Sequence, residues 1–118
     1  MSTSTTLPAL PLLERVEAAR EVALDALTHA TGTQSLCTLG RERLRAAKYH
    51  EGAVVALGDL RRALRRGEPA PTPETWGLGI VEKYAATSPD WRAYLIGGRE
   101  ALSGVRASTP VPAPAATS

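Results

Sequence analysis

The sequence contains no phenylalanine, no asparagine and only five aromatic residues among its 118. Valine and isoleucine together number nine. Because strands use β-branched and aromatic residues to fill a pleated face, this scarcity argues against a β-sandwich or β-barrel. Of the 51 hydrophobic residues (43%), 20 are alanine, so about 31 larger side chains are left for a core. The composition therefore predicts one small, mostly helical domain.

A single cysteine, Cys37, excludes an internal disulfide framework and any zinc site of the four-cysteine or two-cysteine, two-histidine type. The other residues of the softer metal-ligand types, His29 and His50, are far apart and form no paired motif. We therefore expect no metal, no cofactor and no enzymatic activity. Apolar runs are shorter than the roughly 18 residues that span a bilayer, so we expect a soluble, cytoplasmic protein without membrane contact.

The two ends of the chain differ in composition from its middle. Residues 1–11 and 106–118 are rich in Ser, Thr, Pro and Ala, which bury too little apolar area to offset the entropy of ordering. We expect both ends to be disordered and residues 12–105 to form a single helical domain. Its connector, residues 67–72, is rich in proline, which favours extended geometry over a helix.

The pattern of apolar residues and caps predicts a small all-α bundle of about five short helices. A three-helix front would comprise residues 12–31, a helix from near Ser35 to a break at 50–52, and residues 53–66 with Gly67 as C-cap. Thr72-Pro73-Glu74 and Ser88-Pro89-Asp90 each combine an N-cap hydroxyl, proline and a first-turn acid. We expect these two sites to begin the two helices of the rear.

Charge is distributed unevenly although the net charge is only +2. Residues 41–66 carry eight bases and three acids, a balance of +5, and both flanking blocks are acidic. Two interpretations remain open: the cations pair with the acidic stripe of the first helix, or they contact nucleic-acid phosphates without reading sequence. The acids are Glu14, Glu17, Glu21 and Asp25, and the cations are Arg41, Arg45, Lys48, Arg61, Arg62, Arg65 and Arg66.

Four of the five aromatic residues fall within 19 positions and alternate with glycines. Large rings beside glycine-lined helix surfaces are typical of interface anchors, although they can equally be the core of a chain without phenylalanine. The candidate partner interface comprises Trp76, Ile80, Tyr84, Trp91, Tyr94 and Leu95.

Two functional hypotheses follow from these patterns. The first is a small, non-enzymatic, bacterial interaction or regulatory protein that binds another protein or itself through the aromatic helices. A thin core supports it, since oligomerisation often stabilises small domains. The alternative is a sequence-neutral nucleic-acid-binding protein that uses residues 41–66. Twelve Arg against two Lys, with abundant Ala, Gly and Pro, indicate GC-rich coding, the basis for expecting a bacterial source.

Overall fold

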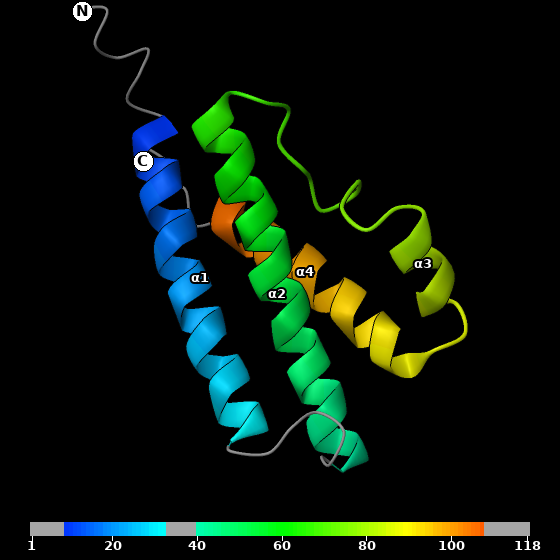
Figure 1. Cartoon of the computed structure of the whole chain (residues 1–118). Coiled ribbons are helices and arrows are strands. Elements are labelled where there is room, and N and C mark those ends of the chain that lie inside the picture. The colour runs from blue at the N-terminus through cyan, green and yellow to red at the C-terminus, as the bar shows by residue number, and fades with distance from the viewer. Residues whose placement is uncertain (1–8, 33–39, 108–118) are drawn as a thin grey trace, which may run out of the picture.

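The computed structural model describes residues 9–32 and 40–107, which form four helices and no strand. The helices are α1 (Ala9–Thr31), α2 (Arg41–Arg66), α3 (Ile80–Ala85) and α4 (Pro89–Ala107) (Figure 1). The all-α class is confirmed, with four helices in place of about five. α1 begins three residues before the expected domain and α4 ends two residues after it, while the rest of both predicted tails lies outside the described residues.

The predicted break at residues 50–52 is wrong, because α2 runs without interruption from Arg41 to Arg66. Gly52 lies inside this helix, and a Cβ atom there would collide with the backbone carbonyl of Tyr94. The glycine therefore permits close approach of α4 and does not end the helix. The two helices predicted on either side of this break are therefore the single helix α2. The helix start expected near Ser35 lies outside the described residues.

The two proline-containing start signals have different outcomes. Ser88-Pro89-Asp90 begins α4 as predicted, and the Trp91 N–H donates to Ser88 Oγ at 3.3 Å. Thr72-Pro73-Glu74 forms only turns, in which the Thr75 N–H donates to Thr72 Oγ1 at 3.1 Å. The prediction of a helix at Thr72 is wrong, because Gly77 and Gly79 adopt positive φ angles of 84° and 89° before α3 begins at Ile80.

The C-terminal caps of the first two long helices follow the sequence. Gly32 and Gly67 have φ angles of 60° and 67°, the left-handed conformation that ends a helix at low cost for glycine. The Gly67 N–H donates to the Ala63 carbonyl. The predicted C-cap at Gly67 is therefore confirmed.

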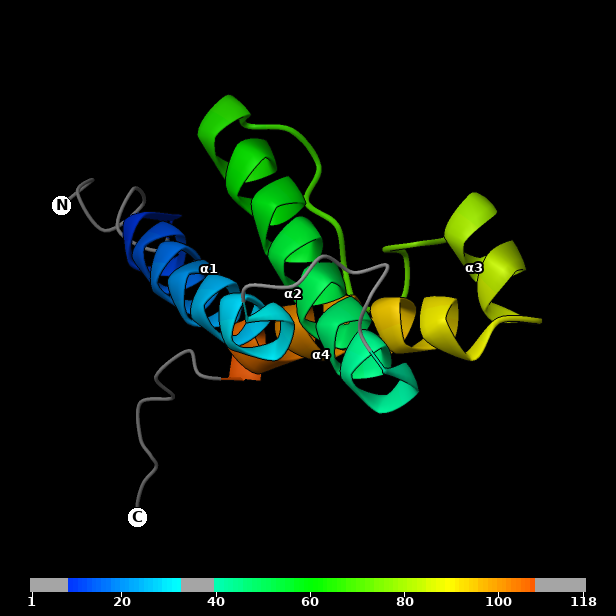
Figure 2. The same cartoon turned by 60° about the horizontal axis from the view of Figure 1, so that its bottom comes forward.

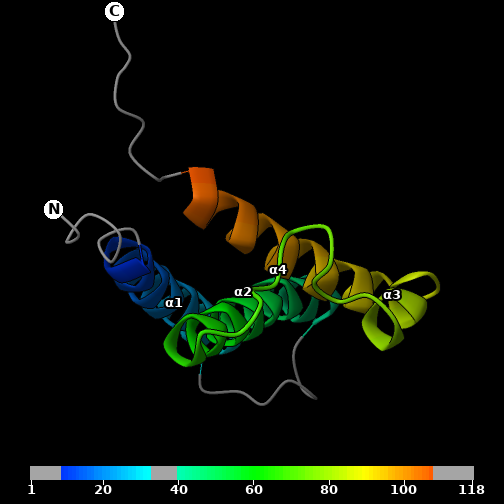
Figure 3. The same cartoon turned by 90° about the horizontal axis from the view of Figure 1, so that it is seen from above.

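α2 is the central element of the fold. α1 lies beside it in antiparallel orientation, and α4 crosses it on another side (Figures 1 and 2). α3 packs on α4 and lies beyond the end of α4 that is farther from α1, as the view from above also shows (Figure 3). Within residues 9–32 and 40–107, no helix has the length and apolarity needed to cross a membrane.

The core is continuous but built largely from small side chains. Among the described residues, thirteen hydrophobic side chains are buried, and six of them are alanine. The largest fully buried side chains are Val16, Leu57, Leu60 and Leu102, which come from three different helices. The expected shortage of large core residues is thus present in the folded chain.

Candidate interaction surfaces

Four aromatic rings form a continuous series from the core to the surface. Trp76 stacks on Tyr94 with ring centroids 5.5 Å apart, Tyr94 meets Trp91 edge-on at 5.1 Å, and Trp91 contacts Tyr84 at 5.7 Å. Trp76 Nε1–H donates to Asp59 Oδ2 at 3.0 Å, which satisfies the indole inside the fold. We call Trp76, Tyr94, Trp91 and Tyr84 the ring series.

The predicted interface residues divide between core and surface. Trp76 and Leu95 are buried within the chain, and Trp91 and Tyr94 are half-buried. Ile80 and Tyr84 are exposed by 70% and 51%. Sequence reasoning missed Leu78, which is 55% exposed between the two positive-φ glycines. Leu78, Ile80 and Tyr84 are thus three exposed large apolar side chains at and just before α3, and we call them together the α3 patch.

A lysine from α2 faces the ring series. Lys48 Nζ lies 4.6 Å from the centroid of the Trp91 ring and 3.2 Å from Glu51 Oε1. Burial raises the pKa of Tyr94, and the nearby charges of Glu51 and Asp59 act in the same direction. Lys48 therefore contacts both the Trp91 ring and the Glu51 carboxylate within the chain.

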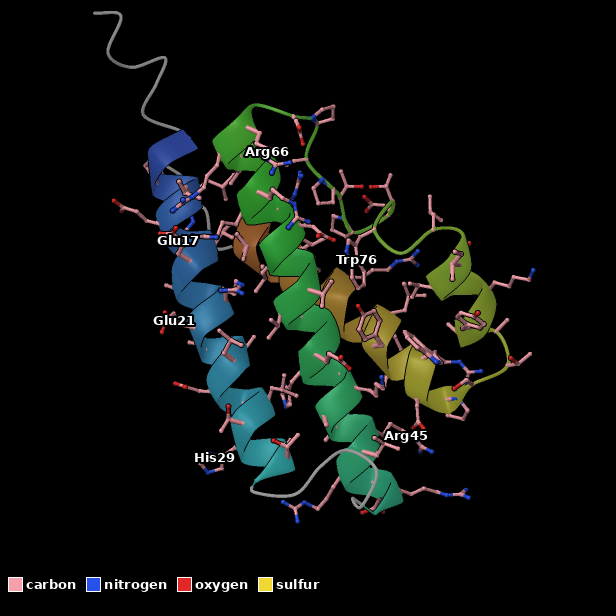
Figure 4. The ribbon with its side chains drawn as sticks, viewed as in Figure 1. Glu17, Glu21, His29, Arg45, Arg66 and Trp76 are labelled. Atoms are coloured by element: carbon pink, nitrogen blue, oxygen red, sulfur yellow. The ribbon has the colours of Figure 1, made fainter. Side chains whose placement is uncertain are left out.

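All seven candidate nucleic-acid cations lie on α2, in two groups near its opposite ends. Figure 4 places Arg45 near the beginning of this helix and Arg66 at its other end. With a rise of about 1.5 Å per residue, Lys48 and Arg61 are separated by roughly 20 Å along the helix axis. The two groups therefore do not converge on one surface point.

Five of these seven cations have ion-pair partners within the fold. Glu17 on α1 accepts hydrogen bonds from Arg61 Nε at 3.0 Å and Arg65 Nη2 at 2.8 Å. The other three pairs are Arg62 with Asp59, Arg45 with Asp90 at 3.6 Å, and Lys48 with Glu51. Among the described residues, Arg41 and Arg66 have no such partner. One member of the acidic stripe, Glu17, thus binds the basic block.

The hydrogen bonds at Glu17 alter its titration. Those from Arg61 and then Arg65 lower the pKa of Glu17, because both arginines stabilise its charged form. At another contact, the Tyr49 hydroxyl donates to the Glu100 carboxylate, which raises the pKa of Tyr49. These two contacts join α2 to α1 and to α4, respectively.

The two histidines, which lie in the described part of the chain, are not grouped with other metal-ligand side chains. His29 is exposed at the end of α1, and His50 lies edge-on to the ring of Tyr49 with centroids 5.4 Å apart. Cys37 lies outside the described residues. In the part of the chain that the structure describes, no three His, Cys, Asp or Glu side chains are grouped to hold a metal ion.

An apolar groove, which sequence reasoning missed, lies between α1 and α4, with α2 as its floor. Its volume is about 540 Å³. Small or apolar side chains dominate its lining, including Ala18, Val22, Ala26, Leu57, Gly104 and Val105. The signal in the sequence is the run of alanine and valine at helical spacing in α1, whose position facing α4 only the tertiary structure shows. We call this surface the α1–α4 groove.

Comparisons with protein families, with characterised proteins and with solved structures find no match to this chain.

Proposed function

We propose that this protein is a small, non-enzymatic interaction protein that self-associates through the α3 patch. The observation that carries the proposal is the exposure of three large apolar side chains within seven residues: Leu78, Ile80 and Tyr84. Exposed apolar surface of this kind marks interaction sites, and rings such as Tyr84 are effective anchors.

Charge and core size favour a second copy of the chain as the partner. Residues 78–92 contain two acids and two bases, Glu82, Asp90, Lys83 and Arg92, so the region has no net charge. Two copies that meet through the same face in a twofold dimer therefore bring together no excess of like charge. The alanine-rich core also leaves stability to be gained from association.

The nucleic-acid alternative has less support from the geometry. Five of the seven cations are engaged in ion pairs, and the two groups lie at opposite ends of α2. Salt-titrated binding to DNA and RNA distinguishes the two functions. Binding that weakens steeply with salt, and is lost when Arg61, Arg62, Arg65 and Arg66 become alanine, would favour the alternative.

Self-association is tested by sedimentation velocity over a range of concentrations. We expect a monomer–dimer equilibrium in the full chain and about tenfold or greater weakening in Leu78→Ser/Ile80→Ser, because both apolar side chains leave the patch. Val55→Ser on α2 is the matched control, since Val55 is also exposed but lies outside the patch. Far-UV circular dichroism checks that the variants remain helical. A chain that stays monomeric at every concentration contradicts the proposal.

A further inference from the structure

The α1–α4 groove is a second apolar surface, separate from the α3 patch. Val22 on its α1 wall is 68% exposed, although it is a large aliphatic side chain. On the α4 wall, a Cβ atom at Gly104 would meet nothing within 4 Å. The two walls therefore present short side chains to open space, and such a surface permits close approach of another helix.

The rim of this groove is acidic. Glu14 and Asp25 lie one helical turn from Ala18 or Val22, and both are exposed. Glu21, by contrast, lines a separate small pocket together with Glu17, Arg20 and Arg61 of α2. Among the described residues, neither Glu14 nor Asp25 has an ion-pair partner.

The opposite rim carries the same sign of charge. Glu100, exposed on α4, lies one turn before Gly104. Arg106 follows Gly104 by two residues, which places it about 160° around the helix and away from the groove. Arg15 is the one arginine or lysine among the residues that line the groove. Counting Arg15 with the three acids, Glu14, Asp25 and Glu100, gives +1 − 3 = −2.

We propose that the α1–α4 groove binds an amphipathic helix of another protein, with a stripe of small or medium apolar side chains and Lys or Arg on both flanks. Apolar anchors at i, i+4 and i+7 match the walls, and the basic flanks match the acidic rims. A second copy of this chain fits poorly, because α1 carries four acids and two arginines and would face a rim of its own charge. This inference goes beyond self-association and does not depend on it.

The binding test uses two synthetic helical peptides of about 18 residues, or roughly five turns, each with one fluorescent label. Both have the same Ala/Leu stripe, but one has Lys flanks and the other has Glu flanks. Fluorescence anisotropy with the full chain measures both affinities. We expect the Lys-flanked peptide to bind at least about tenfold more tightly, with an affinity that falls as salt rises.

Two variants of the full chain locate the binding site. Gly104→Leu fills the groove, and it is expected to fold because the site is open and leucine is a better helix former than glycine. This variant should bind the Lys-flanked peptide with an affinity about tenfold or more lower. Glu14→Lys/Asp25→Lys should lower the affinity for the Lys-flanked peptide and raise the affinity for the Glu-flanked one. Glu82→Lys on α3, an exposed acid outside the groove, is the matched control and should leave both affinities unchanged.

Three results would overturn the proposal. Equal binding of the two peptides, or binding that Gly104→Leu leaves intact, excludes recognition of a basic helix in this groove. A loss of dimer in Gly104→Leu by sedimentation velocity would assign the groove to a second copy. NMR shift changes at residues 111–118 in that variant, without peptide, would assign it to the chain's own C-terminal segment. Loss of dimer in Leu78→Ser/Ile80→Ser alone concerns only the α3 patch.

Discussion

Two glycines allow the backbones of α2 and α4 to meet at their crossing. A Cβ at Gly52 would collide with the Tyr94 carbonyl, and a Cβ at Gly97 would collide with the Tyr49 carbonyl. The contacts are reciprocal, since each glycine faces a residue that lies three positions before the other glycine. Sequence reasoning treated Gly52 as a break, because helix propensity describes only local cost and contains no information about the neighbouring helix.

This crossing predicts a difference between two glycines of α4. Gly97→Ala should lower the free energy of unfolding by about 1–3 kcal/mol, because the new methyl group forces the backbones apart. Gly104→Ala should raise it by up to about 1 kcal/mol, because its Cβ is unobstructed and alanine favours the helix. Urea unfolding followed by circular dichroism measures both. Equal effects of the two substitutions would refute the close crossing.

Among the elements, α1 is joined to the C-terminal turns of α2 through Glu17. Arg61 and Arg65 are one turn apart and converge on the same carboxylate oxygen. Cations near the end of a helix are also favoured by its dipole. The sequence correctly placed acids on α1 and cations on α2, but which acid is bound depends on how the two helices align.

The link at Glu17 predicts a stability that depends on pH. Hydrogen bonds from Arg61 and Arg65 hold the pKa of Glu17 below its ordinary value of 4.5. The stability that ionised Glu17 contributes to the fold is therefore complete above pH 4.5. The contribution is lost as the pH falls through the folded-state pKa. Glu17→Gln should therefore lower the urea midpoint at pH 7 and have a smaller effect in strong acid.

Glu14→Gln is the matched control for this measurement, since Glu14 is exposed on the same helix and has no ion-pair partner among the described residues. It should change the midpoint little at either pH. If Glu17→Gln shifts the midpoint equally at both pH values, the ion pairs do not stabilise the fold.

The element boundaries show what the sequence predicts and what it leaves open. Thr72-Pro73-Glu74 and Ser88-Pro89-Asp90 share the same local pattern, yet only the second begins a helix. The residues that follow decide the outcome, since Gly77 and Gly79 adopt positive φ after the first signal. Gly97 and Gly98 do not interrupt α4, because each is buried against another element, Tyr49 or Trp76. Local patterns therefore predicted helix content better than helix boundaries.

At the scale of the whole molecule, stability is expected to differ between the centre and the α3 end. α2 packs against both α1 and α4, whereas α3 packs on α4. Large side chains of α3 are exposed, and Ala85 is its one buried residue. The functional surfaces depend on this arrangement, because the groove requires α1 and α4 to flank α2. Composition predicted a small core but not which helices would flank one another.

Hydrogen exchange should reveal this difference. In dilute protein, where self-association does not protect the α3 patch, amides of residues 80–86 should exchange at least about tenfold faster than those of residues 53–60. Regions with few buried contacts open without unfolding the whole domain. Mass spectrometry of peptide fragments measures the rates, with α4 residues 98–105 as a protected reference. Uniform protection would mean that the molecule opens as one unit.

The ring series also gives the protein an optical property. Tyr84 lies on the exposed α3 patch, Trp91 is its neighbour at 5.7 Å, and the contacts continue through Tyr94 to buried Trp76. Excitation energy absorbed by a tyrosine passes efficiently to a tryptophan at such separations, and the Lys48 ammonium group lies 4.6 Å from the centroid of the Trp91 ring. A molecule that covers Tyr84 would therefore change the protein's own ultraviolet fluorescence, so occupancy of the α3 patch can be followed without attaching a dye.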